Sequence, residues 1–281
     1  MQHPHPHADR DLARRLERTE GLACAAIVQS RARLQPQSKS CWHDFGGSCA
    51  MFDGAGSPMT QAFGFGLYDD PNGHELDAIE AFFRGHSTQT VLEISPLAGI
   101  HTIATLQQRH YRIVELSSAL CRPSAGGVQA APHMDAALRV RAIDPSETEV
   151  WAEVAAAGWG SKSDEVGRFI RDLSRAIVPA ERMVSFLAEL DGRPVASASL
   201  FLGDGIALLA GASTIPSARN HGAQTALLAA RLDYAARHHC PLAMMATEPG
   251  SASQRNAERQ QFRIAYTRLK WQQQGPAAVR G

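Results

Sequence analysis

The chain has 281 residues, of which 44% are hydrophobic and 20% charged, and its 28 basic and 28 acidic side chains balance at pH 7. Zero formal charge argues against a nucleic acid or an anionic membrane as partner, and a length about twice the commonest domain size predicts two domains. No apolar run is long enough to span a bilayer, and the N-terminus lacks the apolar core of a signal peptide. We therefore expect a soluble, cytoplasmic protein.

The first half predicts a mixed α/β domain over residues 8–124. Helical periodicity covers residues 11–32, and Gly and Pro then interrupt the pattern between residues 45 and 58. The further expected elements are a strand at 61–67, a helix at 75–83, a strand at 88–94, a helix at 97–108 and a strand at 111–121. Small residues at 125–136 predict a linker.

The second half predicts another α/β domain over residues 137–272. Its expected elements are a strand at 137–143, a helix opened by residues 144–146, a helix at 164–177, strands at 183–190, 195–202 and 206–214, a helix at 222–238, a strand at 242–247, a helix at 251–260 and a strand at 262–271. Asp191-Gly192 is a type I′ hairpin signal, so the middle strands should form an antiparallel meander. The next strand, helix and strand predict a right-handed parallel crossover, with Arg231 of its helix turned towards water.

Five cysteines without a CxxC spacing predict neither a disulfide framework nor a zinc site. They are Cys24, Cys41, Cys49, Cys121 and Cys240. Two histidine-bearing segments, 3–7 and 238–240, leave metal binding open as an alternative. We expect no metal, because the first segment is an extended terminus without companion ligands, and adjacent residues at a helix end rarely converge on one ion.

The turn between the strand at 206–214 and the helix at 222–238 carries the strongest functional signal. Pro216 cannot continue the strand, and Gly222 allows the backbone to approach a ligand closely. The first amides of a helix lack intrahelical partners, and the helix dipole favours an anion there. Arg219 adds a positive charge, so the turn is a candidate diphosphate site. An ordinary turn with a solvated arginine is the alternative, and the pattern is neither a Walker loop nor Gly-x-Gly-x-x-Gly.

With that turn in place, residues 137–272 resemble the GCN5-related N-acetyltransferase (GNAT) superfamily. Arg219 and Gly222 match the family pattern Gln/Arg-x-x-Gly-x-Gly/Ala, whereas Gln224 stands where a small residue is usual. The resemblance implies that the turn holds the diphosphate of coenzyme A and that the preceding strand pairs with the pantetheine arm. The implied cofactor-binding residues are Ala212, Ser213, Thr214, Arg219, Asn220, His221, Gly222, Ala223, Gln224 and Thr225.

The resemblance further implies two tandem GNAT-like domains, each a mixed α/β sheet. In the first half, acidic residues at 69–73 occupy the place of the Arg-x-x-Gly turn and should repel a diphosphate. That half is therefore expected to be a degenerate copy, which supplies packing or part of the acceptor site. Trp151 and Trp159 flank the region where family members shape the acceptor pocket, although core packing is the alternative for both.

The expected activity is transfer of acetyl from acetyl-CoA to a primary amine, by direct attack on the thioester. Glu248, at the end of the strand flanking the expected cleft, is the candidate base, and Ser253 and Asn256 could reach the sulfur. Capping of the helix at 251–260 is the alternative role for Glu248 and Ser253, and Ser251 is a further candidate cap.

Two features leave other functions open. Ala257 stands where many members carry the tyrosine that protonates the thiolate, and the strand at 206–214 has no acidic residue. They motivate a second hypothesis, a coenzyme A-binding or regulatory protein with weak or no catalysis. A third hypothesis, aminoacyl-tRNA-dependent transfer, is disfavoured by the zero net charge. The sequence identifies neither the small-molecule amine acceptor nor the oligomeric state, and a homodimer stays open.

Overall fold

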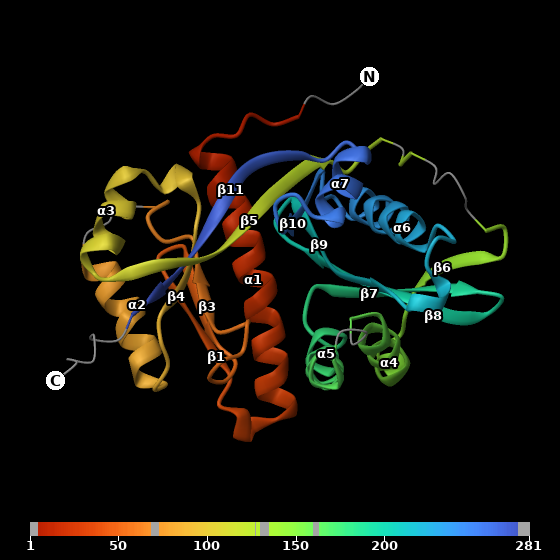
Figure 1. Cartoon of the computed structure of the whole chain (residues 1–281), viewed down its shortest axis with the longest axis horizontal. Coiled ribbons are helices and arrows are strands. Elements are labelled where there is room, and N and C mark those ends of the chain that lie inside the picture. The colour runs from red at the N-terminus through yellow and green to blue at the C-terminus, as the bar shows by residue number, and fades with distance from the viewer. Residues whose placement is uncertain (1–4, 69–72, 127, 130–134, 160–162, 275–281) are drawn as a thin grey trace. The chain divides into compact units, whose positions relative to one another are not determined.

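The computed structural model describes residues 5–68, 73–126, 128–129, 135–159 and 163–274. The chain forms two compact units (Figure 1). The N-terminal unit contains residues 6–120, 246–257 and the chain after residue 262, and the C-terminal unit contains residues 121–245 and 258–262. This division differs from the expected domains, 8–124 and 137–272, because the chain leaves the C-terminal unit after residue 245. Of the expected linker, residues 127 and 130–134 lie outside the described residues.

The N-terminal unit is a mixed sheet with strand order β1-β2-β3-β4-β11-β5. Its strands are β1 (Cys41–Phe45), β2 (Ser48–Phe52), β3 (Gln61–Phe63), β4 (Val91–Ile94), β5 (Tyr111–Pro123) and β11 (Arg263–Gln273), and its helices are α1 (Arg10–Leu34), α2 (Gly73–Gly85) and α3 (Ile100–Gln108). The first three strands are antiparallel neighbours, and β3 runs parallel to β4. A strand, helix and strand therefore form a parallel crossover, β3-α2-β4.

Two strands of this unit depart from the sequence-based expectation. The segment read as a break, residues 45–58, contains β2 and the turn that connects it to β1, where Gly46 and Gly47 have positive φ angles of 72° and 123°. The closing strand β11, expected in the C-terminal domain, instead pairs with β4, with Trp271 opposite Leu92. The order of elements along a chain does not specify which sheet a terminal strand joins, and this explains the second difference.

The C-terminal unit has strand order β6-β7-β8-β9-β10. Its elements are β6 (Leu138–Ala142), α4 (Thr148–Trp159), α5 (Asp164–Ile177), β7 (Met183–Leu190), β8 (Arg193–Leu202), β9 (Ile206–Thr214), α6 (Ala223–Arg237) and β10 (Leu242–Thr247). Strands β6 to β9 are antiparallel neighbours, whereas β9 and β10 are parallel and joined through α6. The expected meander and crossover are therefore both present. A short helix, α7 (Ala252–Arg259), follows β10.

Helices cover both faces of the C-terminal sheet, as Figure 1 shows. Leu187 of β7 packs into a buried cluster with Trp151 of α4, while its neighbour Phe186 meets the ring of Tyr234 of α6 at 5.7 Å between centroids. Successive residues of a strand point to opposite faces, so α4 and α6 lie on opposite sides. The hairpin between β7 and β8 has φ angles of 51° at Asp191 and 73° at Gly192, as its type I′ signal predicts.

No helix in the described part of the chain combines the length and apolar character needed to cross a membrane.

Candidate functional site

Strands β9 and β10 run side by side only where they begin. Parallel pairing extends from Ile206 opposite Leu242 to Leu208 opposite Met244. Beyond that point β9 continues to Thr214, held on its other side by β8. In the described structure, the second half of β9 therefore has no strand partner on the β10 side. A strand edge of this kind offers backbone N–H and C=O groups to an extended ligand.

A bulge interrupts β9 within this unpaired half. Two residues of β9, Gly211 and Ala212, stand opposite one residue of β8, Ala198. Gly211 has a φ of 62°, and a Cβ at this position would lie 3.0 Å from the Oγ of Ser199, so both the backbone angle and the space favour a glycine. Gly211 is exposed and Ala212 half-buried. A bulge takes its extra residue out of the ladder and redirects the local backbone, which can aim backbone groups at a ligand.

The hydroxyl of Ser213, next to the bulge, is engaged within the protein. It lies 3.1 Å from the hydroxyl of Ser197, and α4 approaches so closely that a Cβ on Gly158 would lie 2.4 Å from it. Ser213 is buried, whereas Thr214 is half-buried. A ligand could therefore reach the backbone of Ser213 but not its side chain.

The turn after β9 leads into a helix whose first amides are unpaired. A 3-10 turn, Pro216–Ala218, follows the strand, and both Asn220 and Gly222 have positive φ angles, of 70° and 85°. Gly222 is the N-cap of α6 and offers no capping side chain. The first helical hydrogen bond runs from the amide of Ala226 to the Gly222 carbonyl at 3.0 Å. The amides of residues 223–225 have no acceptor among the described residues, so they are free to bind an anion.

Side chains in the turn differ in their availability. Arg219 is exposed, its Nε lies 3.4 Å from the carbonyl of Thr214, and no described carboxylate pairs with it. Gln224 donates from Nε2 to the hydroxyl of Thr214 at 2.7 Å. His221 is 3.4 Å from a carboxylate oxygen of Asp135, which offsets any charge that the imidazole carries. Arg219 is therefore better placed than His221 to attract an anion.

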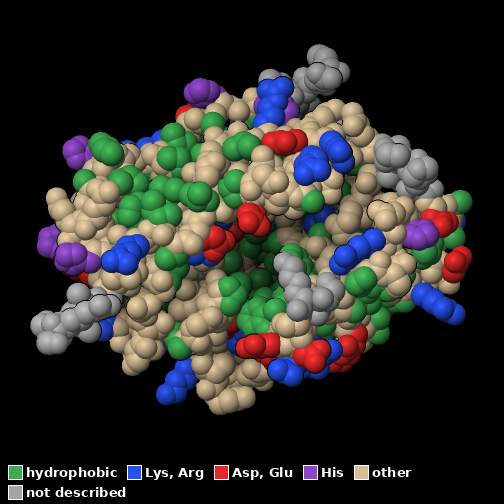
Figure 2. Space-filling model, viewed as in Figure 1, with side chains coloured by type: hydrophobic (Ala, Val, Ile, Leu, Met, Phe, Trp, Pro, Cys, Tyr) green, Lys and Arg blue, Asp and Glu red, His purple; other side chains and the backbone are tan. Residues whose placement is uncertain are grey.

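The visible surface does not concentrate charge of one sign. On the face drawn in Figure 2, Lys and Arg side chains are interspersed with Asp and Glu. An anion site in this protein therefore depends on local donors, such as the unpaired amides of α6.

The three catalytic candidates lie on the segment that follows β10. Glu248, Ser253 and Asn256 are all exposed. Their segment, 246–257, is grouped with the N-terminal unit, whereas the ten predicted cofactor-binding residues come together in the C-terminal unit. The catalytic assignment of these three residues stays a prediction.

Helix α7 shows which serine serves as a cap. The amide of Gln254 donates to the Oγ of Ser251 at 3.1 Å, so Ser251 caps the helix and Ser253 does not. Ala257, the residue at the position of the expected tyrosine, is 1% exposed and packs inward.

The two tryptophans near the expected acceptor region differ in environment. Trp151 is 1% exposed and donates from Nε1 to the carbonyl of Phe186 at 3.0 Å, so it belongs to the core. Trp159 is 42% exposed at the end of α4. Only Trp159 has surface left for a ligand.

The segments considered for metal have other partners. The Nδ1 of His238 donates to the carbonyl of Tyr234 at 2.8 Å, and its ring stacks on the Tyr234 ring, while Cys240 is buried with its Sγ 3.6 Å from the Gly203 carbonyl. Residues 3 and 4 of the N-terminal histidine segment lie outside the described residues. Across the described chain, no three His, Cys, Asp or Glu side chains gather into a metal-binding group, and the five cysteines are free thiols.

In the N-terminal unit, charged side chains fill the core beside β3. Arg268 lies 2.8 Å from Glu20, 3.0 Å from Glu93 and 3.4 Å from Glu17, and its guanidinium is 5.2 Å from the ring centre of Phe63. Burial raises the pKa of Glu17 to about 7, although the charge of Arg268 acts in the opposite direction. The sequence of β11 does not predict that these charged side chains are buried together, because exposed strands also alternate charged and apolar residues.

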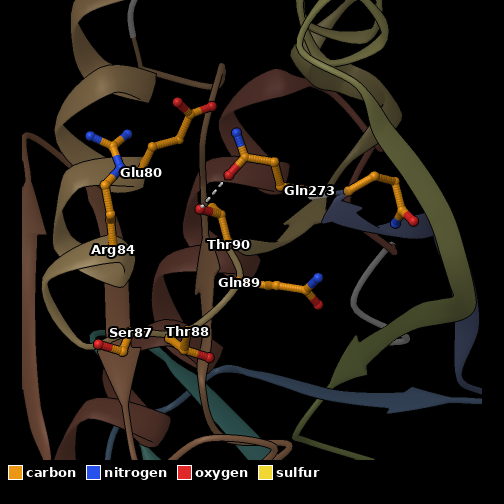
Figure 3. A pocket seen from close by; sticks show the side chains of 8 residues that line it. Glu80, Arg84, Ser87, Thr88, Gln89, Thr90 and Gln273 are labelled. Atoms are coloured by element: carbon orange, nitrogen blue, oxygen red, sulfur yellow. Dashed lines mark hydrogen bonds between the residues drawn. The ribbon is translucent and has the colours of Figure 1, made fainter. Parts of the chain in front are cut away.

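The same unit contains a cavity of about 400 Å³ between α2, the following loop and the end of β11 (Figure 3). Its lining residues are Glu80, Arg84, Ser87, Thr88, Gln89, Thr90, Gln273 and Gln274. Thr90 donates to the Oε1 of Gln273 at 3.2 Å, and Glu80 accepts from the hydroxyl of Tyr111 at 3.1 Å. None of these residues belongs to a motif that the sequence singles out. The acidic turn at 69–73 lies outside the described residues, apart from Gly73.

Residues 125–243 match a family model described as an acetyltransferase (GNAT) domain. The matched segment runs from before β6 into β10, so it includes the whole of β9, its bulge and the turn into α6. No curated protein matches the chain.

Solved structures share the fold over most of the chain. A GCN5-related N-acetyltransferase from Kribbella flavida is 18% identical, with a TM-score of 0.62 over 90% of this chain and 97% of that chain. A tandem GNAT protein from the clavulanic acid biosynthesis pathway is 16% identical, with a TM-score of 0.57 over 97% and 98%. A conserved protein of unknown function from Bacteroides thetaiotaomicron is 11% identical, with a TM-score of 0.59 over 97% and 99%. At such identities the similarity concerns the fold, which this chain shares with GNAT proteins, one of which is described as a tandem GNAT protein.

Proposed function

Because residues 125–243 of this chain match the GNAT acetyltransferase domain model, we propose that the protein transfers the acetyl group of acetyl-CoA to a primary amine. One observation carries the proposal. Strand β9 separates from β10 after Leu208, and the turn that ends β9 leads directly to the three unpaired amides of α6. An extended carrier with an anionic end matches this combination of a free strand edge and a helix start.

The two parts of the carrier would be bound by different groups. The diphosphate is proposed to accept hydrogen bonds from the amides of residues 223–225, with Arg219 adding a charge-assisted contact. The pantetheine arm is proposed to pair with the backbone of residues 212–214 along the free edge of β9. Gln224 fits this scheme despite its size, because its side chain is held by Thr214 and only its amide is required.

The reaction joins the acceptor nitrogen to the thioester carbonyl carbon. As the C–N bond forms and the C–S bond breaks, the nitrogen loses one proton and the departing sulfur gains one, giving an amide and free coenzyme A. Backbone N–H groups at the bulge of Gly211 and Ala212 are proposed to stabilise the developing oxyanion. Glu248, directly or through water, is the proposed base, and Ser253 and Asn256 are proposed to stabilise the sulfur. The support for these three residues is their place in the chain, just after β10.

We further propose a small-molecule amine as acceptor and the cytoplasm as the site of action. The balanced charge supports the first proposal, because it offers no strongly charged surface to a macromolecular polyanion, and the free thiols of all five cysteines support the second.

Ligand binding tests the proposal first. Acetyl-CoA at about 100 times its dissociation constant should stabilise the protein by roughly 2.7 kcal/mol, which raises the melting temperature. Acetyl-pantetheine, which lacks the diphosphate, should bind much more weakly by calorimetry. An unchanged melting temperature at millimolar acetyl-CoA would contradict the proposal, and equal affinity for the two thioesters would contradict the diphosphate site.

A second candidate function is coenzyme A binding without efficient transfer. It is favoured by the buried Ala257 at the position of the expected acid and by the lack of an acidic side chain along β9. Thiol release from acetyl-CoA, measured across a library of primary amines, separates the two functions. Turnover with any amine removes the second candidate, whereas tight binding without turnover supports it.

A further inference from the structure

A buried cation that has no carboxylate partner among the described residues lies beneath β8 and β9. Arg231 of α6 is 3% exposed, in contrast to the expectation that it faces water. In the part of the chain that the structure describes, its hydrogen bonds go only to backbone carbonyls. Burying a guanidinium without a counter-charge costs several kcal/mol, so hydrogen bonds must compensate much of that cost. Burial lowers the pKa of Arg231 to about 10, which leaves the side chain cationic at pH 7.

The guanidinium of Arg231 donates hydrogen bonds to strands β8 and β9 next to the β9 bulge. Its Nε donates to the carbonyl of Leu227, one turn earlier in α6, at 3.1 Å. Its Nη1 donates to the carbonyl of Ser199 at 3.2 Å and to the carbonyl of Ala210 at 3.4 Å. Ser199 and Ala210 are the last register partners before Gly211 and Ala212, so Arg231 spans the two strands where the bulge begins.

The Ala210 carbonyl has a second side-chain donor. The hydroxyl of Ser199 donates to it at 3.1 Å, so a hydroxyl and a guanidinium both hold the carbonyl that precedes Gly211. The carbonyl of Ala210 and the amide of Gly211 belong to one planar peptide group. Fixing the carbonyl therefore fixes the direction of that N–H as well, and the positive φ of Gly211 then sets the direction of the next amide.

We propose that Arg231 is a positioning residue for acetyl transfer, which orients the backbone N–H groups of the bulge towards the thioester oxygen. The inference rests on the proposed function. Arg231 need not touch the carrier, because it acts through the peptide between Ala210 and Gly211. A leucine or methionine could provide the packing of α6 on β9, but neither could hold two carbonyls.

The thioester carbonyl itself reports on this role. Acetyl-CoA labelled with ¹³C at the carbonyl would be bound to the full chain, and its carbonyl stretch measured by isotope-edited infrared spectroscopy. Donation by the bulge should lower the stretching frequency on binding to the wild type. Arg231→Met should lose most of that shift and lower the preference for acetyl-CoA over coenzyme A by about 10-fold, since a hydrogen bond to a polarised acceptor is weakened. Affinity for coenzyme A itself should change little, because the diphosphate site is intact.

Three further variants keep the test decisive. Arg231→Lys retains a donor and should restore part of the frequency shift. Gly211→Ala disturbs the same bulge without removing the guanidinium, because its Cβ would crowd Ser199, and should also lose the shift even if Arg231→Met fails to fold. Arg237→Met removes an exposed arginine of the same helix, paired with Asp233, and should behave as the wild type.

The outcomes separate the inference from the function on which it rests. A full carbonyl shift in Arg231→Met overturns the positioning role. A carbonyl shift in Gly211→Ala equal to that of the wild type overturns it as well. A wild type that binds acetyl-CoA without any carbonyl shift overturns the inference but leaves coenzyme binding standing. Failure of the wild type to bind either acetyl-CoA or coenzyme A overturns the proposed function itself.

Discussion

The two parallel crossovers of this protein, β3-α2-β4 and β9-α6-β10, have the same topology but differ in how the first strand of each is packed. All three residues of β3 are buried, and the ring of Phe63 is covered by Arg268. The second half of β9 is instead partly exposed, carries a bulge and has no partner on the β10 side among the described residues. The comparison indicates that strand length and side-chain size decide whether such a crossover is filled by core side chains or keeps a free strand edge.

Small residues keep the second crossover open. Between Ala210 and Thr214 no side chain is larger than threonine, whereas β3 ends in phenylalanine beside an arginine, glutamates and a tyrosine. We therefore expect substitutions in the first crossover to alter stability and substitutions in the second to alter ligand binding.

The largest expected effect is on stability in the first crossover. Phe63→Ala removes a 1% exposed ring from a cluster with Val28 and Met51, and should lower the free energy of unfolding by about 3–5 kcal/mol. Urea unfolding measures this free energy. Val114→Ala, at a 51% exposed site of the same unit, is the control and should change the free energy of unfolding by no more than about 0.5 kcal/mol. A cost below about 1 kcal/mol would show that this crossover is not packed as described.

The next effect is a pH dependence of the same core. Folding raises the pKa of Glu17 from 4.5 to about 7, mainly through burial, so the native state binds more protons than the unfolded state between these values. The free energy of unfolding should fall as pH rises through this window, by roughly 2–3 kcal/mol.

Glu17→Gln, which resembles the protonated side chain, should abolish most of this slope in urea unfolding between pH 4.5 and 8. Parallel slopes for the wild type and the variant would mean that Glu17 does not titrate in that window.

A smaller effect is expected on binding in the second crossover. Arg219→Ala removes an exposed charge from the proposed diphosphate site and should weaken acetyl-CoA binding by about 5–30-fold, equivalent to about 1–2 kcal/mol. Stability should stay within about 0.5 kcal/mol of the wild type. Calorimetry measures the affinity, and Arg193→Ala, in the exposed hairpin of the same unit, serves as the matched control. Equal affinities of the two variants would remove Arg219 from the site.

Much of the fold could be predicted where periodicity and turn chemistry agree. The strands at 183–190, 206–214 and 242–247 and the helix at 164–177 have the expected bounds, because short alternating or apolar runs lie between strong turn signals. The hairpin at 46–47 was misread because two adjacent glycines indicate a break as readily as a turn. Strand β11 was assigned to the C-terminal domain, whereas it pairs with β4 of the N-terminal unit, because strand periodicity carries no information about the partner strand.

The candidate site was predictable only in part. Pro216 and Gly222 identified the turn, since each has a distinct backbone requirement. Arg231 was placed on the wrong side of α6, because periodicity of a helix with many alanines defines its buried face poorly. The bulge at Gly211 gave no separate signal, and the grouping of Glu248 with the N-terminal unit depends on contacts between residues far apart in sequence.

A crystal structure of the protein with acetyl-CoA tests the central claim most directly. The account predicts diphosphate oxygens within hydrogen-bonding distance, about 3 Å, of the amides of residues 223–225, and the thioester beside Gly211 and Ala212. A diphosphate bound elsewhere, with those amides facing water, would contradict it.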